Sequence, residues 1–118
     1  MTITLPLPPT TNHIYGISAI RGHAMMYITK DGKEWFKTAG EQLKKQWKKK
    51  TPIITPAEIW IVLKLVHDRD VDGSCKPILD LLQKNGVIKN DKLFYKMDVE
   101  KIKVKKGEEG VEFEIQGY

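Results

Sequence analysis

Ala57-Glu-Ile-Trp-Ile-Val-Leu-Lys-Leu-Val-His67 is the stretch of this sequence that decides the fold. Apolar side chains run through it almost without interruption from Trp60 to Val66. A strand that is apolar on both faces usually lies at the centre of its sheet, with neighbours on both edges. The stretch therefore predicts a central strand around which the rest of the chain is arranged.

The elements on either side follow from side-chain periodicity and from helix breakers. Thr29 is a candidate N-cap, and apolar residues recur at helical spacing from Trp35 to Trp47. Gly86 stands where a glycine cap ends a second helix. We expect strands at 2–5, 23–28, 57–67, 93–105 and 111–116, and helices at 30–50 and 74–85. This order predicts an α+β fold, a single small domain over residues 1–118 with one mixed sheet and two helices.

Length and composition exclude several classes of protein. The chain has 118 residues, of which 41% are apolar and 30% charged, as in an ordinary globular domain. No apolar run of about 18 residues is present, and the first residues do not resemble a signal peptide. Cys75 is the single cysteine, with no adjacent histidine, so we expect neither a disulfide nor thiolate catalysis. One Cys and three His are too few for a structural zinc site. We expect a cytoplasmic location with no membrane partner.

The positive charge is concentrated in two segments. Residues 30–50 and residues 84–106 each carry eight lysines against three acids, whereas the remainder of the chain has a net charge of −5. Two basic segments beside a concentration of carboxylates are typical of a protein that holds a polyanion and performs metal chemistry on it. Lysine runs also form solvated faces on proteins of many functions, so this alternative stays open.

The chemistry is concentrated in His67-Asp-Arg-Asp-Val-Asp-Gly-Ser-Cys-Lys-Pro-Ile-Leu-Asp80. If the extended backbone continues beyond the central strand, Asp70 and Asp72 point to the same face. Two carboxylates so placed repel one another unless a cation lies between them, and oxygen ligands favour Mg²⁺ or Mn²⁺ over zinc. Lys76 lies one helical turn beyond Asp72 and is expected to project toward the same place.

A third acid, Asp91, follows the second helix in the loop Gly86–Asp91. If that loop reverses the chain, Asp91 returns to the strand end that carries the first two acids. Three carboxylates and a lysine suit phosphodiester hydrolysis, in which a metal activates water and an ammonium stabilises negative charge.

Each of these residues also has a structural explanation. Asp72 or Ser74 can serve as a helix cap, and Lys76 and Asp80 have the spacing of a surface ion pair. Asp91 can belong to a turn. A calcium loop is the less suitable alternative, because the later glutamate of an EF-hand is missing.

Three segments in this order resemble the RusA family of Holliday junction resolvases, which occurs in bacteria and their phages and prophages. Leu5-Pro-Leu-Pro-Pro-Thr-Thr-Asn12 resembles the family's first strand with its proline-rich turn and asparagine. The segment Arg69–Leu82 resembles its Arg-Asp-x-Asp-Asn-x-x-Lys-x-x-x-Asp-x-Leu motif, and Gly86–Asp91 resembles its glycine followed by an Asp-Asp pair. The resemblance spans nearly the whole chain.

The resemblance implies a RusA-like fold and a site of known composition. By the motif match, Asp70, Asp72 and Asp91 bind the catalytic Mg²⁺, for which Mn²⁺ is a substitute, and Lys76 is the essential lysine. Asn12 is assigned a structural or substrate-positioning role. The implied activity is that of a crossover-junction endodeoxyribonuclease, a homodimer that resolves four-way junction DNA by paired symmetric nicks in recombination and repair.

Two departures from the family pattern lie beside these residues. Gly73 stands where asparagine is usual, and Asn90 replaces the first acid of the Asp-Asp pair. Neither removes a ligand, but both change the groups around the metal, which can cost one or two orders of magnitude in activity.

Two other functions remain open at the level of sequence. The first is a non-catalytic basic DNA-binding module, in which the acids are caps and turns. The second is a nuclease for other branched DNA, which shares the site and differs in substrate shape. A loop with His13, Tyr15, Arg21 and His23 is expected either to approach DNA or to be ordinary surface.

Overall fold

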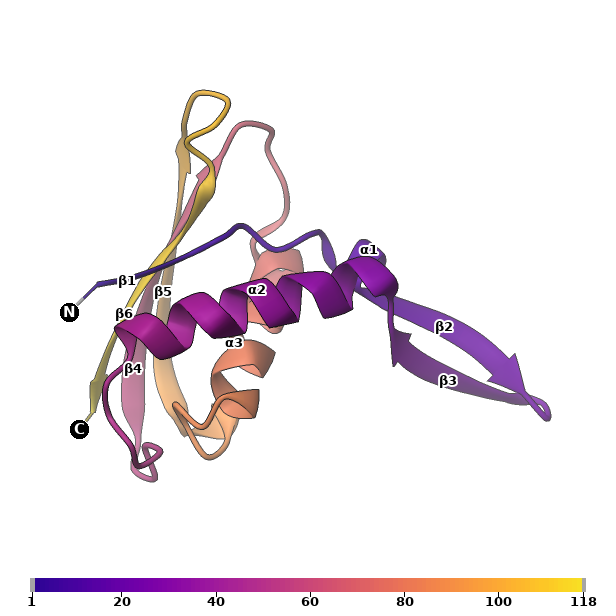
Figure 1. The fold of residues 1–118 in the computed structure, drawn as a ribbon, viewed down its shortest axis with the longest axis horizontal. Coiled ribbons are helices and arrows are strands. Elements are labelled where there is room, and N and C mark those ends of the chain that lie inside the picture. Colours follow the sequence, from indigo (N-terminus) through magenta and orange to yellow (C-terminus); the bar gives the residue numbers. More distant parts are fainter. Residues whose placement is uncertain (1, 118) are drawn as a thin grey trace.

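Strand β4 (Ala57–Leu65) lies at the centre of a four-stranded sheet in the computed structural model, which describes residues 2–117 except for the side chains of residues 11, 12, 19 and 20. The strand order is β1-β6-β4-β5, with β1 (Ile3–Leu5), β5 (Phe94–Lys103) and β6 (Gly110–Gly117) (Figure 1). Because β4 is parallel to β5 and antiparallel to β6, the sheet is mixed. The predicted central strand and α+β class are confirmed.

One face of the sheet carries the core. Alternate residues of β4 from Ala57 to Leu65 are buried, and the residues between them are half-buried. Helices α2 (Lys30–Gln46) and α3 (Val71–Lys84) pack against the buried face (Figure 1). Their apolar side chains join one cluster with Ile59, Ile61 and Leu63. Alternation of this kind is typical of a strand with one face against the core and one face toward solvent.

Helix α2 begins as predicted and ends earlier than expected. The Thr29 side chain accepts a hydrogen bond from the Gly32 amide at 3.1 Å, which confirms the N-cap. The helix stops at Gln46 instead of continuing to Lys50. The three residues after Trp47 are all lysines, so a longer helix would bury no further apolar side chain. Helices in proteins depend on such burial for their stability.

Helix α3 begins at Val71, three residues before the predicted start at Ser74. A start at Ser74 would put Pro77 in the first turn, where proline is favoured. The structure instead places Pro77 inside the helix, where it is buried in the core. The C-terminal end agrees with the prediction, because Gly86 has a φ of 72° directly after the C-cap residue Asn85.

A second sheet is a hairpin of β2 (Tyr15–Ile20) and β3 (His23–Ile28). Strand β3 confirms the strand predicted at 23–28, whereas β2 and its pairing with β3 were not predicted. It follows a short helix, α1 (Thr11–Ile14), and projects away from the rest of the molecule (Figure 1). The expectation of a loop was therefore wrong for residues 15–20, which form β2. Arg21 and Gly22 both have positive φ angles, as the central residues of a tight hairpin turn require, but arginine is not a usual signal for such a turn.

The sequence predicts strands at 93–105 and 111–116 joined by the short segment Lys106–Gly110, but the two strands, β5 and β6, are not paired with each other. Strand β4 lies between β5 and β6, so the connecting segment crosses the end of β4. There the Val104 amide donates to the Leu65 carbonyl at 2.9 Å. In the described part of the chain, no helix is long and apolar enough to cross a bilayer.

Candidate active site

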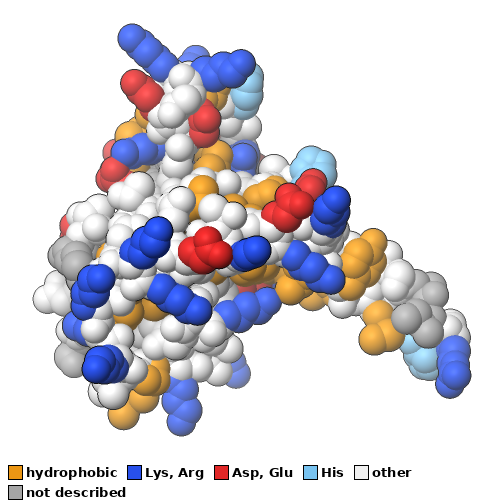
Figure 2. Space-filling view, in the orientation of Figure 1, with side chains coloured by type: hydrophobic (Ala, Val, Ile, Leu, Met, Phe, Trp, Pro, Cys, Tyr) orange, Lys and Arg blue, Asp and Glu red, His pale blue; other side chains and the backbone are white. Residues whose placement is uncertain are grey.

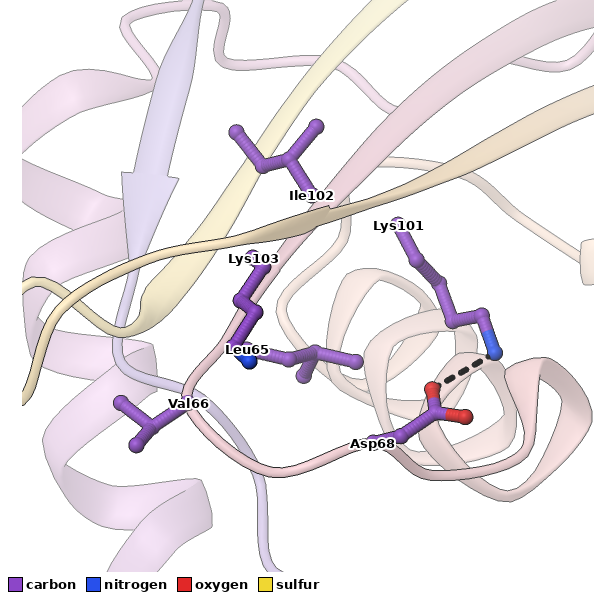
Figure 3. A pocket seen from close by; sticks show the side chains of 6 residues that line it. All are labelled: Leu65, Val66, Asp68, Lys101, Ile102 and Lys103. Carbon is purple, nitrogen blue, oxygen red and sulfur yellow. Dashed lines mark hydrogen bonds and ion pairs between the residues drawn. The ribbon is translucent and has the colours of Figure 1, made fainter.

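The loop between β4 and α3 is held in place from two sides. From β5, the Lys101 ammonium lies 2.8 Å from Asp68 Oδ1 (Figure 3). The same ammonium lies 3.2 Å from the Arg69 carbonyl. From the other direction, the Arg69 guanidinium donates to the carbonyl of buried Pro8 at 2.6 Å. The proline-rich segment and β5 therefore position the backbone immediately before Asp70.

A hollow of about 400 Å³ lies at this end of β4 and β5 (Figure 3). It is lined by residues of both strand ends and by Asp68 of the loop. The Lys101 ammonium lowers the pKa of the Asp68 carboxyl through its hydrogen bond and its charge. Asp68 is therefore ionised at neutral pH.

Asp70 and Asp72 lie together at the N-terminal end of α3. Asp70 occupies the N-cap position with an extended backbone, and its carboxylate makes no capping hydrogen bond. Asp72 lies in the first turn, and both side chains are exposed. The positive end of the helix dipole favours two carboxylates here, and neither is used to cap the helix. The expected cause of their proximity was wrong, because β4 ends at Leu65 and the start of a helix brings them together.

Lys76 lies one turn after Asp72 on the same face of α3. Its ammonium lies 4.8 Å from the centre of the Tyr15 ring. Within the described residues, Lys76 and Asp80 do not form the ion pair that their spacing allowed, and the Tyr15 hydroxyl donates to Asp80 Oδ2. Burial, together with the hydrogen bond to Asp80 and its charge, raises the pKa of Tyr15 well above its ordinary value.

Asp91 lies at the opposite end of α3, in the short 3₁₀ helix η1 (Asp91–Leu93). Its amide donates to Gln83 Oε1 at 3.1 Å. Because a helix rises about 1.5 Å per residue, Gln83 lies about 16 Å from Asp72 along the axis of α3. A single chain therefore does not bring Asp91 to the other two acids, contrary to the sequence expectation.

Within residues 2–117 as described, no three His, Cys, Asp or Glu side chains form a group that could hold a metal ion. Asn12 belongs to α1, but its side chain lies outside the described part of the structure, so its predicted role is untested. Cys75 is buried, and burial followed by the nearby Asp72 charge raises the pKa of its thiol. A protonated, inaccessible thiol agrees with the expectation that Cys75 is not a nucleophile.

Exposed lysines cover the outer side of α2. Figure 2 shows Lys and Arg side chains gathered along this helix. All eight lysines of residues 30–50 are exposed, and within the described residues none of them forms an ion pair. These charges are therefore available to an anionic partner.

Two residues that shape the site were not recognised from the sequence. Lys101 was one of eight lysines in its segment, and only its register opposite Leu63 in the parallel pair places it beside the loop. Tyr15 was expected in a loop, either near DNA or at the ordinary surface, whereas it begins β2 and contacts α3. The alternation of Tyr15–Ile20 was the available signal, and it indicates the strand without indicating the contact.

The comparisons with known proteins agree with the motif order. The family model for endodeoxyribonuclease RusA matches residues 6–116. The chain belongs to the RusA family. A RusA crossover junction endodeoxyribonuclease of Aquifex aeolicus (strain VF5) is 38% identical over 61 residues, which are 52% of this chain and 48% of that protein. The chain thus spans about half the length of the curated relative it matches.

The two departures from the RusA motif lie at opposite ends of α3. Gly73 is in the first turn, between Asp72 and Ser74. Asn90 is the N-cap of η1, and its side chain accepts a hydrogen bond from the Lys92 amide at 2.9 Å. Asparagine and aspartate are equally good caps, so Asn90 retains the capping function that the RusA acid would have.

Proposed function

We propose that this protein is a Mg²⁺-dependent endodeoxyribonuclease that resolves Holliday junctions by paired symmetric nicks, in recombination and repair. The observation that carries the proposal is the pair of exposed carboxylates of Asp70 and Asp72 beside Lys76, in a chain of the RusA family. The Asp70 carboxylate makes no capping hydrogen bond to the helix. When bound, a divalent cation supplies an activated water and neutralises charge at the phosphorus. Lys76 is suited to stabilising negative charge on the phosphate oxygens.

The carboxylate ligands fit Mg²⁺, with Mn²⁺ as a substitute, but their placement in one chain does not complete the site. Asp70 and Asp72 supply two acids, and Asp91 lies a helix length away. We infer that the protein acts as a homodimer, in which Asp91 of one copy meets Asp70 and Asp72 of the other. Two-fold symmetry makes two such sites, one for each strand cut in a symmetric junction.

The distribution of charge over the two sides of the sheet supports a proposal for where DNA binds. The face of the sheet that carries no helix includes Trp60 and Val62, whose neighbours on β5 and β6 are acidic. These acids are Asp98, Glu100, Glu112 and Glu114, of which Asp98 pairs with Lys96 and Glu112 pairs with Lys64. We propose that the junction lies on the opposite, helical side, near the α2 lysines, with an affinity that falls steeply as salt increases. We also propose that the protein is encoded by a bacterium or a phage and acts in the cytoplasm. The proposal includes a single domain over the chain.

The first experiment uses a labelled four-way junction and a matched linear duplex, each incubated with Mg²⁺ or EDTA. We expect paired nicks in opposite strands of the junction only with Mg²⁺, and no cuts in the duplex. Asp70→Asn should abolish cutting and retain junction binding, whereas Asp98→Asn, on the open face of the sheet, should cut normally. Metal-independent binding without any cutting would favour the non-catalytic module, and cutting of flaps in preference to junctions would favour a nuclease for other branched DNA.

A mixing experiment tests the shared site. Asp70→Asn and Asp91→Asn are each expected to be inactive alone. In a mixed dimer of the two, one shared site carries both substitutions and the other carries none, so single nicks should return. If each site instead lay within one chain, both sites of the mixed dimer would be damaged and no activity would return.

A further inference from the structure

Tyr15, Lys76 and Asp80 form a cluster between the base of the hairpin and α3. The Lys76 ammonium lies 4.8 Å from the centre of the Tyr15 ring, and the Tyr15 hydroxyl donates to Asp80 Oδ2. Lys76 is exposed, whereas Tyr15 and Asp80 are partly buried. A single tyrosine thus contacts both the lysine and the carboxylate that follows it by one turn.

Two carboxylates on α3 are close enough to form an ion pair with Lys76. Asp72, Lys76 and Asp80 are each four residues apart, so they follow one another along a single face of α3. The ammonium can turn toward Asp72, at the acid end of the helix, or toward Asp80, one turn away from it. Asp80 is already hydrogen-bonded to Tyr15, and the ring offers the ammonium a face rich in electron density.

We propose that Tyr15 is a positioning residue for Lys76. Its hydroxyl donates to Asp80 and so disperses the negative charge that would otherwise draw Lys76 into an ion pair, while its ring holds the ammonium by a cation–π contact. The inference rests on the proposed function, because it assumes that Lys76 acts on the substrate.

The placement of Lys76 can be tested without any activity measurement. NMR of the lysine side chains in the free protein should show the ε-methylene protons of Lys76 shifted upfield by the Tyr15 ring. Tyr15→Leu should abolish that shift, and Tyr27→Phe, at another tyrosine of the same hairpin, should leave it unchanged. A Lys76 signal at the ordinary position in the unmodified protein would overturn the inference, whether or not the protein cuts DNA.

The consequence for the reaction is tested by rescue. Tyr15→Phe keeps the ring and frees Asp80, so Lys76 should turn to Asp80 and the single-turnover cleavage rate should fall about 10- to 100-fold with unchanged junction binding. Adding Asp80→Asn removes the competing charge and should restore the rate in Tyr15→Phe. The same addition should not restore Tyr15→Leu, which lacks the ring.

The results separate this inference from the proposed function. If the unmodified protein shows the NMR shift but cuts nothing, the proposed function fails while the placement of Lys76 stands. If the unmodified protein cuts and Tyr15→Phe cuts equally fast, the positioning role is wrong. A loss in Tyr15→Phe that Asp80→Asn does not rescue would also overturn it, because it would indicate a general structural role for the hydroxyl.

Discussion

Strand β4 and the β2–β3 hairpin are both rich in apolar residues, but they differ completely in exposure. Ile59 and Ile61 of β4 are 0% and 1% exposed. In the hairpin, Ile17 and Met26 face each other in register and are 77% and 61% exposed. The comparison shows that the pattern of apolar residues does not by itself determine burial, because burial requires a second layer to pack against.

The hairpin is held at its base instead of along its length. The Thr29 amide donates to the Ile14 carbonyl at 2.7 Å, and Ile14 is fully buried. Gly32 of α2 fits beneath this junction, where a Cβ would lie 2.8 Å from the Ile14 carbonyl oxygen. Because an isolated two-stranded hairpin is only marginally stable in water, these anchors and the contact of Tyr15 with Asp80 keep it in place.

The largest effect on stability should come from the centre of β4. Ile61→Ala removes buried methyl groups between the sheet and its helices and should lower the free energy of unfolding by about 2–5 kcal/mol. Urea denaturation followed by circular dichroism measures this change. A loss below about 1 kcal/mol would mean that the core can collapse around the cavity, and the contrast with the hairpin would disappear.

An intermediate effect is expected where the two regions join. Thr29→Ala removes the N-cap of α2 and the hydrogen bond that its hydroxyl donates to the His13 carbonyl. The expected loss is about 0.5–2 kcal/mol by the same urea measurement. Thr38→Ala, at an exposed position in the middle of α2, is the matched control and should have little effect.

A smaller effect is expected in the exposed hairpin. Ile17→Ala should change the free energy of unfolding by less than about 0.5 kcal/mol, because little surface is buried there in one copy. The measurement should be repeated over a range of protein concentrations. A larger loss that grows with concentration would show that a second copy covers this face, which would sharpen the comparison.

The smallest effect is a local one at the loop before Asp70. The Asp68 pKa is lowered by Lys101, so their interaction is complete at neutral pH and is lost as pH falls through the lowered pKa, below about pH 4. NMR titration of the backbone amides of residues 66–70 should show this transition. Lys101→Met should move the transition up to the ordinary aspartate range and leave the urea midpoint nearly unchanged, since Asp68 is exposed.

Local rules succeeded at several positions where the deciding contacts lie close in sequence, although they missed the two-residue turn at Arg21 and Gly22. The Thr29 cap, the Gly86 stop and the central position of β4 follow from side-chain chemistry and periodicity over a few residues. The early start of α3 did not follow from these local rules. It places Pro77 inside the helix, where the burial of Pro77 in the core compensates for its unfavourable position. Long-range packing there outweighs a local preference.

The candidate site divides in the same way. Asp70, Asp72 and Lys76 lie within two turns of helix, so their proximity was predictable although its expected cause was wrong. The distance of Asp91 was not predictable, because it depends on β4 and β5 being parallel. In a parallel pair, the segment that leaves β4 and the segment that enters β5 lie at opposite ends of the sheet.

The sequence by itself determined the family, the α+β class, the acidic and basic residues available for chemistry, and most element positions, since motifs and periodicity are local properties of the chain. Only the tertiary structure decided that the hairpin projects with its apolar side chains exposed and that Asp91 is a helix length from Asp70. It also decided that Tyr15 lies between Lys76 and Asp80. These relations join residues as many as 65 positions apart, and strand order and packing, which local preferences do not encode, set such distances.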